Sequence, residues 1–106
     1  MTVKLEKDLE NGQYRNEQNV SAATSLAVLC TDDKNVLTVG LVKETTGTGK
    51  IQFTLSSASS VIAGTAVWID WPAGSVTATT VDRILGPVTA VRAIVSSGVL
   101  RFYVVA

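Results

Sequence analysis

The sequence has no histidine and a single cysteine, Cys30. The missing histidine removes the commonest general base and the commonest transition-metal ligand. One cysteine excludes an intrachain disulfide framework and a thiolate metal site, and we expect Cys30 to behave as a small apolar residue. Serine and threonine are abundant, but a hydroxyl nucleophile would then need a lysine or an N-terminal amine as its base. The sequence therefore predicts a protein that is not an enzyme and carries no cofactor or metal.

Charge is also scarce and balanced, with nine basic and nine acidic residues and a formal net charge of zero. The basic residues are scattered, whereas a nucleic-acid partner requires them to cluster. The long uncharged run at 51–69 contains too many serine, threonine and glutamine residues to cross a membrane. No basic stretch followed by an apolar core marks a secretory signal, so synthesis in a cytoplasm is expected. We predict no nucleic-acid partner and no membrane partner.

A glycine-rich run followed by lysine lies within Thr45–Leu55 and resembles the end of a phosphate-binding loop. Such a loop requires an earlier glycine, a hydroxyl residue after the lysine and a following helix. Glu44 occupies the position of the first glycine, and Ile51 replaces the hydroxyl residue. We predict instead a hairpin turn in which Gly47 and Gly49 adopt positive φ.

Valine, alanine, leucine, isoleucine and threonine dominate the rest of the chain, which is a composition typical of β-proteins. Short apolar runs are separated by turn residues, among them the polar cluster at 31–35. This spacing predicts an all-β fold, a small β-barrel or β-sandwich of seven or eight short strands. A short helix near 56–62 is expected. A helix at 21–29 is the less favoured alternative, because that segment is rich in alanine. The predicted strands are 25–30, 36–42, 51–55, 66–71, 76–80, 84–95, which is broken at residues 86–87, and 99–106.

Residues 1–19 hold seven of the eighteen charged residues and show little apolar periodicity. Such a segment buries little surface on its own, so we predict an extended or flexible N-terminal arm. Residues 20–106 are then a single β-domain. The arm is either a frayed tail or a segment that orders against a partner. We predict that its deletion leaves the β-domain folded and weakens attachment to the partner; unchanged attachment would mean that the arm takes no part in binding.

Aromatic residues are few, so their positions are informative. Trp68 and Trp71 fall on opposite faces of a predicted strand, with Val67 and Ile69 beside Trp71, so at most one tryptophan belongs wholly to the core. An exposed tryptophan is a typical interface anchor. Arg101 and Tyr103 share the outer face of the last strand. The candidate partner-binding residues are Val3, Leu5, Leu9, Tyr14, Arg15, Trp68, Trp71, Arg101 and Tyr103.

The overall design resembles the small capsid decoration, or cement, proteins of tailed bacteriophages. The resemblance rests on the polar N-terminal segment and on two Thr/Val/Ala-rich passages, 62–80 and 84–91. It implies a β-barrel or β-tulip-like protein on the outer capsid surface of the virion. Such a protein binds as a homo-oligomer, a dimer or a trimer, and clamps neighbouring subunits of the major capsid protein. The family offers no catalytic residues to transfer.

Two alternatives remain open. The chain could be a small β-sandwich that binds a ligand such as carbohydrate through Trp68, Trp71 and Tyr103. It could also be a structural component of a phage tail or baseplate. The binding module predicts a monomer that retains a soluble glycan, whereas the structural reading predicts a dimer or trimer that retains none.

Overall fold

A computed structural model describes residues 2–7, 9–10, 12–30, 36–72, 74–85 and 88–106. Within these ranges the chain forms eight strands and one short helix, which confirms the all-β prediction. The same residues contain no helix with the length and apolar character needed to span a membrane. The elements are β1 Thr2–Lys4, β2 Glu6–Lys7, β3 Tyr14–Ser21, β4 Ala27–Leu29, β5 Val36–Thr54, α1 Ala58–Ala63, β6 Trp68–Asp70, β7 Thr80–Leu85 and β8 Ala90–Val105.

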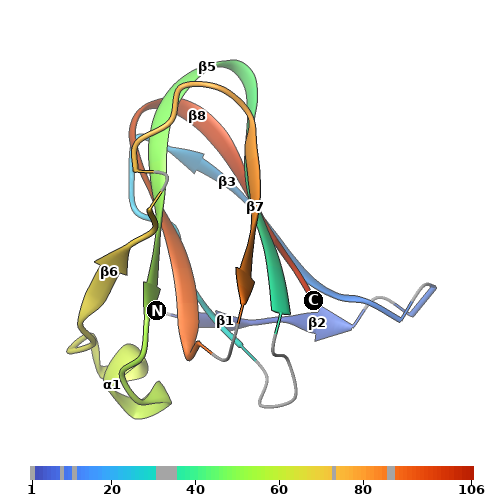
Figure 1. Ribbon diagram of the computed structural model, residues 1–106, viewed down its shortest axis with the longest axis vertical. Coiled ribbons are helices and arrows are strands. Elements are labelled where there is room, and N and C mark those ends of the chain that lie inside the picture. Colours follow the sequence, from blue (N-terminus) through green and yellow to red (C-terminus); the bar gives the residue numbers. More distant parts are fainter. Residues whose placement is uncertain (1, 8, 11, 31–35, 73, 86–87) are drawn as a thin grey trace.

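Two long strands, β5 and β8, form the framework of the sheet and pair antiparallel along most of their length. The other edge of β5 pairs with β7 and then with β6, while the other edge of β8 pairs with β3 and β4. Strand β1 runs parallel to β4, and β2 pairs with β3. The sheet curls until it is nearly closed into a barrel, with β7 on one side and β3 on the other (Figure 1).

The barrel interior follows from the alternation of apolar residues along β5 and β8. Successive side chains of a strand point to opposite faces, so every second residue enters the barrel. Phe102 is fully buried, and its neighbours two residues away on β8 are buried with it. Arg101 and Tyr103 lie on the outer face, as the sequence predicts. The interior residues of the two strands include Leu37, Val39, Leu41, Ile51, Val91, Ala93, Val95, Leu100, Phe102 and Val104.

The predicted hairpin turn at Gly47 and Gly49 is wrong, because the chain continues through both glycines as part of β5. Neither glycine has a positive φ. A Cβ atom at either position would lie 2.9 Å from a side-chain carbon of Leu100. The glycines therefore make room for a buried leucine. Register shifts beside each of them allow the long strand to bend.

Most of the described residues between 2 and 19 are extended and belong to the sheet. Residues 15–19 pair with 101–105 of β8, and 2–4 pair with β4. Leu5 joins the buried core with 5% of its surface exposed. We therefore expect the deletion to destabilise the β-domain, because it would remove β1, β2, most of β3 and a core residue.

Helix α1 lies close to the helix expected at 56–62. The Ser57 side chain accepts a hydrogen bond from the backbone N–H of Ser60, and Gly64 ends the helix with a φ of 80°. Val61 packs into a second, smaller apolar cluster of Ala27, Leu29 and Ala90. The helix considered for 21–29 does not form, since 27–29 is β4. The polar turn expected at 31–35 lies outside the described residues.

Candidate interaction surface

Four large apolar side chains are exposed around β6. Val67 is 71% exposed, Leu55 65%, Ile62 62% and Ile69 42%. Thr54 of β5 pairs with Trp68 of β6, so Leu55 and Val67 follow as neighbours across the ladder. Helix α1, which carries Ile62, lies at the same end of the molecule (Figure 1). We call these four residues the apolar patch.

The sequence placed Val67, Ile69 and Trp71 on one face of this strand without deciding whether that face is buried. In the structure Val67 and Ile69 are exposed. Strand β6 has only three residues, and within the described chain it pairs with β5 alone. Within the described residues one of its backbone edges is therefore unpaired, and the side chains of Ile69 and of Val67, just before the strand, are exposed.

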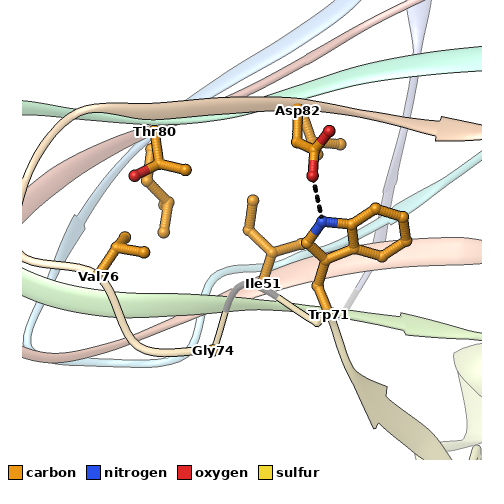
Figure 2. A pocket seen from close by; sticks show the side chains of 8 residues that line it. Ile51, Trp71, Gly74, Val76, Thr80 and Asp82 are labelled. Atoms are coloured by element: carbon orange, nitrogen blue, oxygen red, sulfur yellow. Dashed lines mark hydrogen bonds between the residues drawn. The ribbon is translucent and has the colours of Figure 1, made fainter.

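Trp71 packs against the barrel core between the end of β6 and β7. Its ring meets that of Phe53 edge to face, with centroids 5.7 Å apart and an interplanar angle of 77°. Figure 2 shows its indole Nε1 donating a 2.8 Å hydrogen bond to Oδ2 of Asp82. This hydrogen bond, then the backbone N–H of Arg83 and its charge, lower the pKa of the Asp82 carboxyl below its usual value. Trp71 is half-buried, and its contacts with Phe53 and Asp82 give it a structural role.

The space beside Trp71 is too small for a ligand. It measures about 10 Å³ and lies between β5, β7 and the 74–76 segment, with Ile51 and Val76 in its wall (Figure 2). A single water needs about 10–15 Å³ and several polar partners. This cavity is therefore a packing gap of the barrel.

Trp68 lies on the outer face of the sheet, where it is half-buried against the second apolar cluster. The guanidinium of Arg92 covers its ring at 4.2 Å from the centroid. Arg92 Nε donates to Gln52 Oε1 at 2.9 Å, and Gln52 Nε2 donates to Asp70 Oδ1 at 2.7 Å. Lys50 Nζ donates to the other oxygen of Asp70 at 3.1 Å. The polar network thus crosses β8, β5 and β6.

The Asp70 carboxyl is stabilised in its charged form by this network. The hydrogen bond from Gln52, followed by that from Lys50, lowers its pKa below the usual value. Partial burial also lowers the pKa of the Arg92 guanidinium. Arginine nevertheless stays charged in proteins, so the network carries fixed charges at neutral pH.

A groove of about 520 Å³ opens beside this network. It lies between α1 and the 24–27 segment, and Trp68 and Arg92 form part of its lining. Its walls include Leu26, Val61 and Ala66. We call it the α1 groove.

Three of the predicted partner-binding residues share the outer face of β3 and β8. Arg15 pairs with Val105 in the β3–β8 ladder, and Tyr103 and Arg101 follow on the same face of β8. All three side chains are half-buried. Arg15 also lies 3.7 Å from the carboxylate of Glu17. The structure therefore brings these residues together as one polar face.

The other predicted residues are dispersed. Val3 and Tyr14 are half-buried against the barrel core, and Leu5 is inside it, out of reach of a partner. Leu9 is 92% exposed in the turn between β2 and β3. Trp68 and Trp71 lie on different faces, so they form no shared aromatic platform.

Sequence reasoning missed the apolar patch and Arg92. The alternation at 67–71 is the pattern of a half-buried strand, and it does not reveal that β6 lies at an edge. Arg92 stands in an apolar strand, where a charged residue is itself a signal of an outward position. Arg92 contacts Trp68, which lies twenty-four positions earlier in the sequence. No pattern of neighbouring residues predicts such a long-range contact.

The fold and these surfaces define a small, nearly closed β-barrel with an apolar patch and a groove at one end. Among the described residues, no group of three His, Cys, Asp or Glu side chains is placed to hold a metal ion. Comparisons with family models, curated proteins and solved structures found no match to this chain.

Proposed function

We propose that this chain is a non-catalytic structural protein of a phage virion. It binds the outer surface of the head and clamps neighbouring major capsid subunits. The observation that carries the proposal is the apolar patch beside the unpaired edge of β6. Solvent-exposed apolar groups at an open strand edge are typical of surfaces that associate with other proteins.

The patch provides two kinds of contact at once. Covering an exposed valine, leucine or isoleucine contributes about 1–2 kcal/mol per side chain. The edge of β6 offers backbone N–H and C=O groups to an added strand. A head carries many copies of its subunits, so modest contacts made by a dimer or trimer add up through multivalency.

The carbohydrate alternative receives less support. Sugar rings stack on exposed aromatic faces, but Arg92 covers one face of the Trp68 ring. Trp71 packs against Phe53 and donates its N–H to Asp82. Both tryptophans are half-buried and held in these contacts, which argues against a glycan platform.

Cosedimentation with tailed-phage heads that lack decoration tests the proposal. We expect saturable binding and a rise in the temperature at which the heads release their DNA. Binding to purified tails and not to heads would instead favour a structural role in a tail or baseplate. Retention on a glycan array without any binding to heads or tails would overturn the structural role.

A further inference from the structure

Arg92 presents unused hydrogen-bond donors to the α1 groove. Its Nε is committed to Gln52 Oε1 at 2.9 Å. The terminal nitrogens of its guanidinium make no hydrogen bond to any described residue, although Arg92 lines the groove. Partial burial removes some of the water that would otherwise solvate the charge, and this lowers its pKa. An anion in the groove would restore the lost solvation.

The guanidinium is also held in one orientation. Trp68 supports one of its faces at 4.2 Å, and Gln52 holds its inner edge. Gln52 is fixed in turn by Asp70, and Asp70 by Lys50. A preorganised guanidinium loses little conformational freedom when it binds, and its planar fork matches the two oxygens of a carboxylate.

The charge and shape of the groove favour one type of ligand. Arg92 is the only charged residue among the described residues that line it. The nearest carboxylate of the network, Asp70, already accepts hydrogen bonds from Gln52 and Lys50. Leu26, Val61 and Ala66 offer apolar contacts to the carbon atoms next to a carboxylate.

We propose that the α1 groove binds an acidic side chain of a partner polypeptide, with its carboxylate on the terminal nitrogens of Arg92. A glutamate fits the site because its methylene groups can contact the apolar walls while its carboxylate reaches the guanidinium. A sugar acid fits less well, since the guanidinium covers the ring of Trp68. The site belongs to the single chain and does not depend on the proposed attachment to phage heads.

An NMR titration with two blocked peptides tests the site. The probes are acetyl-Gly-Ser-Glu-Gly-amide and the same peptide with glutamine in place of glutamate. We expect the glutamate peptide to shift the Trp68 indole and the Arg92 Nε–H resonances saturably, with a Kd on the order of 1 mM. The glutamine peptide should bind at least about tenfold more weakly, because it lacks the charge. The Trp71 indole resonance serves as the internal control.

Two substitutions sharpen the test. Arg92→Lys keeps the charge but loses the planar fork, so we expect about a tenfold loss of affinity, whereas Arg83→Lys on β7 should change nothing. Ala66→Glu places a competing carboxylate at the groove and should abolish binding, while Ala66→Gln has nearly the same volume without the charge. Ala66→Gln should therefore bind better than Ala66→Glu. The melting temperature of each variant shows whether it is folded.

Three results would overturn the proposal. Equal binding of the two peptides would mean that the carboxylate is not recognised. Wild-type affinity in Arg92→Lys or in Ala66→Glu would remove Arg92 and the groove from the site. Saturable binding of propionate together with no response to the glutamate peptide would show that the site takes only free carboxylates, and would overturn the assignment of a polypeptide partner.

Discussion

The barrel interior and the α1–β6 end bury apolar residues to very different degrees. The interior packs side chains mainly from β5, β7 and β8 around Phe102, and the cavity in it beside Trp71 measures about 10 Å³. The α1–β6 end has a buried cluster of four small or medium side chains, a groove of about 520 Å³ and four exposed large apolar residues. The interior therefore stabilises the fold, and the other end carries surface that another molecule can cover.

The largest expected effect is the deletion of residues 1–19. It removes β1, β2 and most of β3, exposes one edge of β8 and takes Leu5 from the core. We expect the shortened chain to lose its cooperative thermal transition in circular dichroism. The single substitution Leu5→Ala should have a smaller effect and lower the free energy of unfolding by about 2–5 kcal/mol. A deletion variant that melts near the wild-type temperature would return this segment to the role of a separate arm.

Substitutions in the two apolar clusters compare the regions directly. Phe102→Ala should lower the free energy of unfolding by about 3–5 kcal/mol, because its large cavity cannot collapse. Val61→Ala in the smaller cluster should cost about 1–2 kcal/mol. Urea denaturation measures both values. Equal losses would mean that the α1–β6 end is packed as tightly as the barrel.

The two kinds of glycine site in β5 give a further contrast. An alanine Cβ at Gly47 would meet Leu100 at 2.9 Å, but one at Gly40 would meet Val81 at the ordinary distance of 3.4 Å. Gly47→Ala should therefore lower the free energy of unfolding by about 1–3 kcal/mol. Gly40→Ala should change stability by less than about 1 kcal/mol. Matching melting temperatures for the two variants would contradict the packing role assigned to Gly47.

The smallest effect concerns acid stability. The pKa of Asp82 is lowered in the folded chain by Trp71, so its contribution is present above the unfolded pKa of about 3.9. That contribution is lost as the pH falls through the lower folded value. Asp82→Asn should therefore flatten the fall in stability below about pH 4. Thermal melts across this range provide the measurement.

Asp70→Asn in β6 is the matched comparison. Asp70 also has a lowered pKa, so its substitution should flatten the acid profile in the same direction. Only Asp70→Asn should also weaken carboxylate binding, because it releases the Gln52 side chain that orients Arg92. A profile in either variant as steep as that of the wild type would show that the carboxylate contributes nothing.

Local alternation explains why much of the fold could be predicted. Leu100, Phe102 and Val104 recur at every second position, and that period specifies both a strand and its buried face. The helix near 58–63 was also predictable, because Ser57 and Gly64 provide its start and end signals locally. These features need no knowledge of distant residues.

The remainder depends on contacts between distant parts of the chain. In the sequence Gly47 resembles a turn residue. Its packing role depends on Leu100, which lies some fifty positions further along the chain. Charges on the short strands near the N-terminus resemble those of a disordered tail, because edge strands also turn polar side chains to water. The exposure of Val67 and the pairing of Trp68 with Arg92 likewise arise only when β6 and β8 are placed on β5.

The binding of an apolar-patch variant to undecorated heads tests whether the α1–β6 end is the interaction surface. Val67→Thr combined with Ile69→Thr keeps β-branched residues in and beside β6 and removes apolar surface. We predict a melting temperature within a few degrees of the wild type and at least about a tenfold loss of head binding, since two buried contacts disappear. Val99→Thr on β8, the control, should bind as the wild type does. Wild-type binding by the double variant would contradict the claim that the α1–β6 end is the interaction surface.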